Sequence, residues 1–217
     1  MSEALISASQ VSYERHYQSV FGCLSLSLQA GDTLVLSGSN GSGKTTLMKI
    51  LAGILRPTHG RIELARCHYV GHQHGLQLQL TVLDNLRHYL HLQGGSQAAQ
   101  RGQDHDSETI CLQALQAFNV TDLATRRVSA LSAGQLKRAA LARLLLTGRP
   151  LWLLDEPFVN LDKASINLLL KLLRQHCQQG GVAIIASHEL GLADLPDSRH
   201  LRLPLRAQNV STDRDSA

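Results

Sequence analysis

The chain has 217 residues, 43% of them hydrophobic and 18% charged, which is the composition of a folded globular protein with a sizeable core. Its net charge of +4 comes without a dense block of Lys and Arg, so the composition does not point to nucleic-acid binding. No apolar run approaches the ~18 residues of a membrane span, and no basic segment precedes a long apolar one at the N-terminus. We therefore expect a cytoplasmic protein that reaches a membrane only through partners.

Strand and turn signals fill the segment before residue 38. Residues 4–29 are rich in β-forming side chains, and Leu24–Leu28 alternates apolar and polar residues with the period of a half-buried strand. Ala30–Asp32 is a turn signal, and the apolar run Thr33–Ser37 after it predicts another strand. The N-terminal segment is therefore expected to form β-structure.

The stretch GSNGSGKTT contains the pattern G-x-x-x-x-G-K-[ST] between that strand and a helix predicted to run to about Leu55. Glycines let the backbone curl and aim its N–H groups at an anion, and Lys44 can reach the β- and γ-phosphates of a nucleotide. The hydroxyl of Thr45 can ligate Mg²⁺. The pattern predicts an ATP site, against the alternative of a Gly/Ser-rich turn before an ordinary helix. Its members are Gly38, Ser39, Asn40, Gly41, Ser42, Gly43, Lys44, Thr45 and Thr46.

After this loop, Arg56–Gly60 is expected to end the helix, and short strands are expected at Arg61–Leu64 and Cys67–Gly71. Gln73 follows the second of these strands. A neutral amide there can contact Mg²⁺ or a water, although this signal is weak on its own.

The middle of the chain changes to helical periodicity between residues 81 and 146. It reads as a helical lobe inserted into an α/β core. The expected parts are a helix capped by Thr81, a polar linker at Gly94–Asp106, a helix at Ser107–Phe118, a loop at Ala124–Ala130 and a helix at Gln135–Leu146.

The segment LSAGQ at Leu131–Gln135 is a second helix start suited to phosphate. Ser132 can cap the helix, and Gly134 allows an anion to approach the backbone closely. Two chains arranged head to tail would let this helix start close onto the other chain's ATP. The alternative is an ordinary capped helix.

Two wholly apolar runs, Leu151–Leu154 and Val182–Ala186, predict strands covered on both faces, with a helix at Lys163–Gln178 between them. Strands alternating with helices favour a mostly parallel sheet, in which ligands bind at the carboxyl ends of the strands. The first run ends in Asp155-Glu156 and the second in Ser187-His188. Asp155 is placed to hold Mg²⁺, Glu156 to polarise an attacking water and His188 to donate to the γ-phosphate. The alternatives are solvated turn acids and a structural histidine.

Together these segments resemble the nucleotide-binding subunits of ABC transporters, and the resemblance covers roughly residues 4–205. It rests on six motifs in the family's order. They are the phosphate loop, Gln73, LSAGQ, LWLLDE at Leu151–Glu156, Asn160-Leu161-Asp162 and His188. Within that family the chain is similar to the haem-exporter ATPases of cytochrome c biogenesis. This finer resemblance rests on the short chain, YVGHQ at Tyr69–Gln73, Ala133 in LSAGQ, and LWLLDEPF at Leu151–Phe158.

The resemblance implies a P-loop NTPase fold of the ABC ATPase type, with a mostly parallel core sheet, an N-terminal antiparallel β layer and an inserted helical lobe. It implies one domain over residues 1–205, with a core at about 1–75 and 147–205, a helical lobe at about 76–146 and a polar tail at 206–217.

It also implies two such chains sandwiching two ATP molecules. Glu156 would act as the base, His188 as the γ-phosphate contact and Lys44 as a phosphate ligand, while Thr45, Gln73 and Asp155 would be the magnesium ligands. LSAGQ of one chain would complete the site of the other. The further residues implied to bind nucleotide are Leu131, Ser132, Ala133, Gly134, Gln135 and Asp162.

The implied partners are transmembrane subunits of a haem exporter at the cytoplasmic face of the bacterial inner membrane. The family's adenine-stacking aromatic falls at about Arg15, so Tyr13, Arg15 and Tyr17 all stay open as the adenine contact. An ABC exporter of another cargo, a non-transport ABC ATPase and a small-molecule kinase are the alternative functions.

Overall fold

The computed structural model describes residues 4–71, 74–93, 104–187 and 198–203. Its strands form one antiparallel and one parallel sheet. The antiparallel sheet has the order β2-β1-β4, with β1 at Ile6–Arg15, β2 at Gln18–Leu28 and β4 at His59–Leu64. The parallel sheet has the order β5-β6-β7-β3-β8, with β3 at Thr33–Gly38, β5 at Cys67–Val70, β6 at Leu151–Asp155, β7 at Val182–Ala186 and β8 at Ser198–Leu203.

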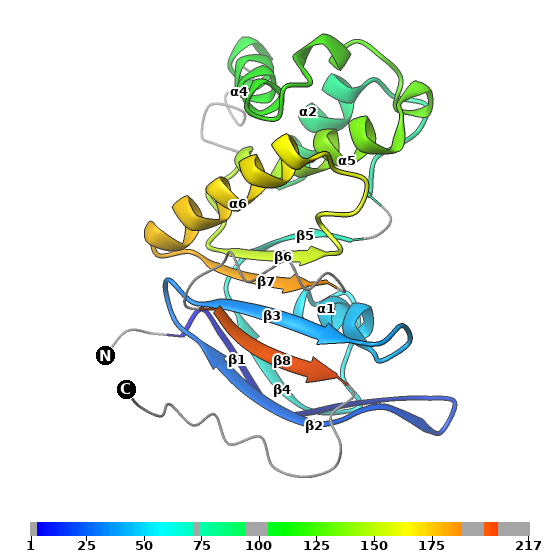
Figure 1. The fold of residues 1–217 in the computed structure, drawn as a ribbon, viewed down its shortest axis with the longest axis vertical. Helices are drawn as coiled ribbons and strands as arrows, with labels where there is room; N and C mark the ends of the chain where they lie inside the picture. The colour runs from blue at the N-terminus through cyan, green and yellow to red at the C-terminus, as the bar shows by residue number, and fades with distance from the viewer. Residues whose placement is uncertain (1–3, 72–73, 94–103, 188–197, 204–217) are drawn as a thin grey trace.

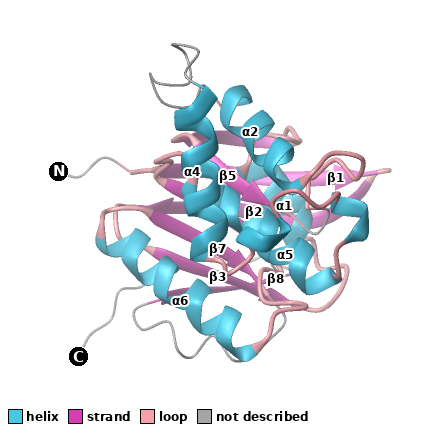
Figure 2. Ribbon diagram, turned by 90° about the horizontal axis from the view of Figure 1, so that it is seen from above, coloured by secondary structure: helices cyan, strands magenta, loops and turns pink. Residues whose placement is uncertain are grey.

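The helices connect these strands and gather mostly at one end of the molecule (Figure 1). They are α1 at Lys44–Leu51, α2 at Val82–Leu92, α4 at Asp104–Ala117, α5 at Ala133–Ala142 and α6 at Lys163–Gln178, with short 3-10 turns η1 at Thr121–Leu123, η2 at Val128–Ala130 and η3 at Arg143–Leu145. Seen from above, α2, α4, α5 and α6 lie over the strands (Figure 2). Among the described helices, none has the length and hydropathy of a membrane span.

The parallel sheet is covered on both faces, which explains its continuous apolar strands. Alternate residues of each strand enter different cores: Leu153 of β6 packs with α1 and the antiparallel sheet, whereas Leu154 packs with α6 and the helical end. β6 and β7 are buried at every position. The parallel pairing of these strands and the helices that alternate with them confirm the α/β class and the mostly parallel sheet expected from the sequence.

Two local expectations are wrong, and one strand was not expected. Helix α1 ends at Leu51 and not near Leu55, because Gly53 takes a left-handed conformation with φ +71° that terminates it. Helix α4 begins at Asp104, inside the expected linker, and residues 94–103 lie outside the described part of the chain. The sequence also provided no expectation of β8.

The last helix of the middle segment also differs from its expected bounds. It begins two residues earlier than expected, at Ala133, and turns into the 3-10 segment η3 at Arg143. The expected loop at 124–130 contains η2. The capped start of α2 at Thr81 and the bounds of α6 are confirmed.

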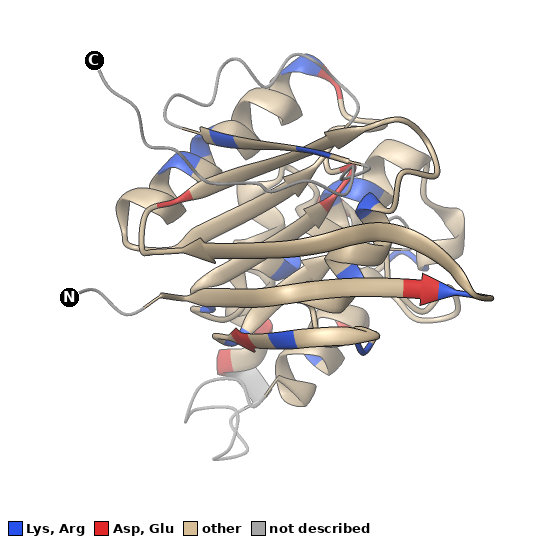
Figure 3. Cartoon of the chain, turned by 90° about the horizontal axis from the view of Figure 1, so that it is seen from below, with Lys and Arg blue, Asp and Glu red and all other residues tan. Residues whose placement is uncertain are grey.

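Charged residues are distributed over many elements. Viewed from below, Lys and Arg occur singly along several strands and helices, interleaved with a few Asp and Glu (Figure 3).

Candidate functional site

The phosphate loop joins the end of β3 to the start of α1 and depends on three glycines with positive φ, at +145° for Gly38, +79° for Gly41 and +97° for Gly43. A Cβ on Gly38 would lie 2.3 Å from the carbonyl oxygen of Leu203, and one on Gly43 would lie 3.0 Å from Val20. Larger residues would therefore displace the loop. As a result, the first N–H groups of α1 stay available to an anion, together with the positive end of the helix dipole.

The Lys44 side chain forms hydrogen bonds with the backbone of this loop. Its ammonium donates to the carbonyl oxygen of Gly38 at 2.8 Å and to that of Ser39 at 3.1 Å. Burial lowers the pKa of Lys44, while the negative charges of Glu156 and Asp155 raise it. The lysine is thus positioned between loop carbonyls within the field of both acids, as a phosphate ligand requires.

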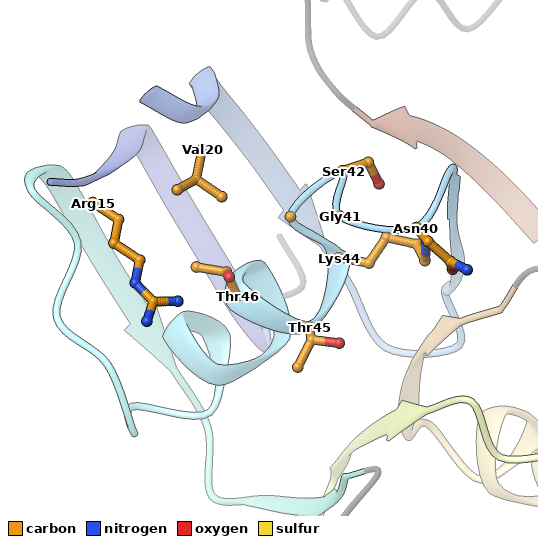
Figure 4. Close-up of a pocket in the computed structure, with 9 residues that line it drawn as sticks. Arg15, Val20, Asn40, Gly41, Ser42, Lys44, Thr45 and Thr46 are labelled. Carbon is orange, nitrogen blue, oxygen red and sulfur yellow. The ribbon is translucent and has the colours of Figure 1, made fainter. Parts of the chain in front are cut away.

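A pocket of about 330 Å³ opens beside the loop, lined by Arg15, Val20 and Asn40–Thr46. Figure 4 shows Arg15 at one end of this pocket and Asn40 and Lys44 at the other, with Val20 and Thr46 between them. The volume is in the range of small-ligand sites. All of its lining comes from β1, β2 and the phosphate loop with the start of α1.

A second pocket of about 320 Å³ shares Arg15 and Thr46 with the first and is completed by Tyr13, Lys49 and Leu55. Tyr17, by contrast, is fully exposed at the turn between β1 and β2 and lines neither pocket. Of the three candidates for the adenine contact, the structure therefore brings Arg15 and Tyr13 to the nucleotide side of the loop.

The two acids lie where β6 ends. Asp155 is 1% exposed, and its Oδ2 atom is buried without a hydrogen-bond partner among the described residues. Glu156 follows in a left-handed conformation with φ +50°, and its N–H donates to the carbonyl of Ala186 on β7 at 2.8 Å. Positive φ in a glutamate is a strained conformation that functional sites often retain.

The donor set suits Mg²⁺ bound partly by phosphate. The buried Oδ2 atom of Asp155 lacks a hydrogen-bond partner among the described residues, and Thr45 lies in the first turn of α1, directly after the phosphate loop. Within the described residues there is no group of three or more His, Cys, Asp or Glu that could enclose a metal ion by itself. Mg²⁺ commonly takes one or two protein ligands and completes its shell with substrate phosphates and water.

The LSAGQ segment forms the start of α5 with a complete capping box. The Ser132 hydroxyl accepts from the N–H of Gln135 at 3.3 Å, and the Gln135 side chain accepts from the N–H of Ser132 at 3.0 Å. Ser132 and Ala133 are exposed, and neither pocket beside the phosphate loop is lined by residues 131–135. Within one chain, the structure does not bring the two phosphate-type helix starts together in one pocket.

Asp162 acts as a helix cap. Its carboxylate accepts from the N–H of Ser165 at 2.8 Å. Hydrogen bonding by the Ser165 side chain, and then by its N–H, lowers the pKa of the Asp162 carboxyl. Gln73 and His188, two further candidates, lie outside the described residues. Their roles stay predictions from the sequence.

Two residues near the acids escaped the sequence reasoning. Lys137 of α5 is 2% exposed; burial lowers its pKa to about 8, and the charges of Asp155 and Glu156 oppose this shift. Burial raises the pKa of Tyr69 on β5, and the negative charge of Asp155 and a side-chain hydrogen bond to Asp155 raise it further. Lys137 could have been identified from its position on the apolar stripe of an amphipathic helix, because a lysine there faces the core.

Comparison with known proteins agrees with this geometry. The family profile described as ABC transporter matches residues 21–159. The cytochrome c biogenesis ATP-binding export protein CcmA of Paracoccus denitrificans is 47% identical over 187 residues, or 84% of this chain and 81% of that protein. The protein of the same name from Paramagnetospirillum magneticum is 39% identical over 216 residues, or 94% of this chain and 95% of that protein.

Among solved structures, an ATP-binding subunit of an ABC transporter superposes with a TM-score of 0.81 at 23% identity, over 92% of this chain and 86% of that one. This structural likeness supports the fold, and the curated relatives extend over nearly the whole chain. The chain belongs to the ABC transporter family, as an ATP-binding subunit of the CcmA type.

Proposed function

We propose that this chain is the ATP-hydrolysing subunit of an ABC exporter that acts in cytochrome c biogenesis, with haem as the cargo. The observation that carries the ATPase assignment is the shared sheet edge. The phosphate loop follows β3, and Asp155 and Glu156 end β6, while β7 lies between these two strands. The phosphate loop and the two acids therefore lie at the same edge of the sheet, where one nucleotide can contact both.

Each group has a distinct chemical task in this proposal. The loop amides and Lys44 bind the β- and γ-phosphates, and Arg15 or Tyr13 contacts the adenine. Glu156 takes a proton from the attacking water and orients it in line with the γ-phosphate, and His188 donates to a γ-phosphate oxygen. The products are ADP and inorganic phosphate, with the proton of the attacking water transferred first to Glu156.

Thr45, Asp155 and Gln73 are the residues that would hold Mg²⁺. When bound, the ion supplies positive charge to the phosphate oxygens. The unpartnered Oδ2 of Asp155 supports its place in this set, because a buried carboxylate oxygen is costly unless a cation or a donor satisfies it.

We also propose that two chains close head to tail on two ATP molecules. The start of α5 is capped and exposed, yet lies outside the pocket of its own phosphate loop. In the proposed dimer, Leu131–Gln135 of one chain contacts the γ-phosphate held by the other, and Asp162 lies near the shared boundary. The N–H groups at a helix start suit that anionic contact.

The proposed partners are the transmembrane subunits of the exporter, with this chain peripheral on the cytoplasmic face of the inner membrane. The CcmA relatives carry cytochrome c biogenesis and export in their names, which supports this assignment. The residues 76–146 are proposed as the helical lobe that contacts those subunits, and residues 1–75 and 147–205 as the ATPase core.

Phosphate release by the purified chain tests the ATPase assignment. The substitution Glu156→Gln should reduce the rate by about 10²-fold to 10⁴-fold, the usual contribution of a general base, while ATP still binds. The exposed Glu63→Gln on β4 is the matched control and should keep the wild-type rate. An unchanged rate in Glu156→Gln would refute Glu156 as the base.

The cargo is tested separately in a strain that lacks this chain. Cytochrome c maturation should fail, return with the wild-type chain and stay lost with Lys44→Ala. Normal maturation in the deletion strain would leave the ATPase assignment intact and point to another cargo.

A further inference from the structure

Arg143 lies where the chain leaves the parallel sheet for the helical end and returns from it. The outgoing connection runs from β5 towards α2, and the return runs from η3 to β6. The Arg143 guanidinium donates to the carbonyl of Gly75 at 3.4 Å and also to the carbonyl of His74. It therefore joins the end of the α5–η3 helical segment to the two residues that follow Gln73.

The side chain is held on its other sides as well. It is 6% exposed, its Nε donates to the carbonyl of Ala140 at 3.2 Å, and its guanidinium carbon lies 5.0 Å from the ring centroid of Tyr89. A Cβ added to Gly75 would lie 3.2 Å from the Arg143 Nη1, so the loop approaches the guanidinium closely. Three helical or loop segments thus meet at one buried cation.

Tyr89 extends the contact into the sheet through His68, which is fully buried on β5. The His68 Nε2 lies 3.1 Å from the backbone carbonyl oxygen of Thr147 and 3.0 Å from the Thr147 hydroxyl oxygen. The carbonyl can only accept and the hydroxyl oxygen can accept as well, so the tautomer with the proton on Nε2 satisfies both contacts. Nδ1 is then an acceptor, and the Tyr89 hydroxyl 2.7 Å away donates to it. Burial lowers the pKa of His68 to about 4, so the neutral ring and this direction of donation hold near pH 7.

These contacts define the Arg143 network: Arg143, Tyr89, His68, Thr147 and the carbonyls of His74 and Gly75. Arg143 has no ion pair among the described residues; carbonyl oxygens and an aromatic ring are its only described partners. Separating a buried guanidinium from such partners costs far more than separating a surface pair, because water does not replace them. The network is therefore expected to move as one body.

The same helical segment carries LSAGQ at its other end. From Ala133 to Ala142, α5 has 10 residues, so the capped start and Arg143 are about 15 Å apart along one rigid element. A shift at the start of α5 must reach Arg143, and through it the loop at 74–75.

We propose that Arg143 is a positioning residue that makes the loop after Gln73 follow the start of α5 when the latter engages ATP. This inference rests on the proposed function in one respect, the closure of Leu131–Gln135 onto nucleotide. When ATP binding moves α5, the Arg143 network moves residues 74–75 with it, although none of its members contacts ATP.

Hydrogen exchange in the Glu156→Gln background tests the link, with ATP and Mg²⁺ present or absent. In the parent, ATP should slow amide exchange in both segments, residues 131–135 and residues 74–80. Arg143→Lys keeps the charge but loses the fork of donors. It should reduce ATP protection of 74–80 by at least about fivefold, the low end of measured couplings, and leave that of 131–135 unchanged. Tyr89→Leu, which removes the ring beside the Arg143 guanidinium, should also reduce the ATP protection of residues 74–80.

Arg87→Lys is the matched control, since Arg87 lies on α2 with Tyr89 and pairs at the surface with Glu108. This substitution should leave the ATP protection of both segments as it is in the parent. Urea unfolding followed by the fluorescence of Trp152, the single tryptophan, checks that each variant folds. If Arg143→Lys does not fold, Tyr89→Leu decides the result.

Equal ATP protection of residues 74–80 in the parent and the variants would overturn the inference. An equal loss of protection in both segments would also overturn it, because a purely structural role of Arg143 would produce that result. A parent without ATP protection at 131–135 would instead refute the proposed closure itself. The two failures are thereby distinguishable.

Discussion

Two buried lysines accompany the two acids at the end of β6. Lys44 comes from the phosphate loop and Lys137 from α5, and the charges of Asp155 and Glu156 act on the pKa of both. Desolvation of an ammonium is costly unless a carboxylate is near. The acids therefore stabilise the charged lysines before any nucleotide binds, and Lys137 links the helix of LSAGQ to the acids electrostatically.

At the same scale, His68 should make stability depend on pH. Its folded-state pKa of about 4 is below the unfolded value of 6.5, so the unfolded chain binds more protons between these values. Stability from this group is complete above pH 6.5 and is lost as the pH falls towards 4, by about 3 kcal/mol in total.

Urea unfolding of wild type and His68→Gln at pH 7.5, 6 and 5 measures this contribution. The variant should be less stable at pH 7.5 and lose less stability on acidification. Parallel curves for the two proteins would show that His68 is not the group responsible.

Gly134 packs against the segment before α6. A Cβ there would lie 2.8 Å from the carbonyl oxygen of Asn160, whose φ is +66°. Gly134→Ala should therefore displace α5 or residue 160, at a cost of about 1–3 kcal/mol in unfolding free energy, and slow ATP hydrolysis. Gly148→Ala, where a Cβ meets nothing within 4 Å, should do neither. Wild-type stability in Gly134→Ala would contradict the close approach.

At the scale of elements, substitutions at two helix caps distinguish an effect on stability from an effect on ATP hydrolysis. Ser132 caps α5 and Thr81 caps α2 by accepting a backbone N–H. Ser132→Ala and Thr81→Ala should each lower the unfolding free energy by about 0.5–2 kcal/mol. Only Ser132→Ala should also slow ATP hydrolysis, because α5 is proposed to engage the partner's ATP. Equal loss of hydrolysis in both variants would argue for a purely structural role of the Ser132 cap.

How much of the fold the sequence predicts depends on how each element is buried. β6 and β7 are covered on both faces, so their apolar runs identified them, and the Asp162 cap marks the start of α6. β8 was missed because only two of its six residues are buried and its sequence, SRHLRL, has no apolar run. The true end of α1 depends on the backbone of Gly53, which a composition signal at Arg56–Gly60 obscured.

The candidate site was predictable where a motif is continuous in sequence. The phosphate loop, the acids after β6 and the capped LSAGQ segment are all found where the sequence indicated. Lys137 and Tyr69 were missed because they approach Asp155 from other elements, and only the packing of α5 and β5 against the sheet determines that approach.

At the scale of the whole molecule, strand order decides what the site can do. β7 separates β3 from β6, so the phosphate loop and the acids leave strands about 10 Å apart, at ~4.8 Å per strand. In the proposed mechanism, the γ-phosphate and the attacking water lie between the groups that these two strands carry. Strand order could not be read from the sequence, because crossover connections of similar length permit several orders.

The chain holds one phosphate loop with its acids and, elsewhere on its surface, one exposed LSAGQ helix start. A working site is therefore proposed to need two copies. Sedimentation equilibrium of Glu156→Gln with ATP and Mg²⁺ measures this directly. We predict twice the 23.7 kDa mass of the chain with ATP and the single mass with ADP. A mass of 23.7 kDa at saturating ATP, with ATP binding demonstrated in the same sample, would contradict the head-to-tail site.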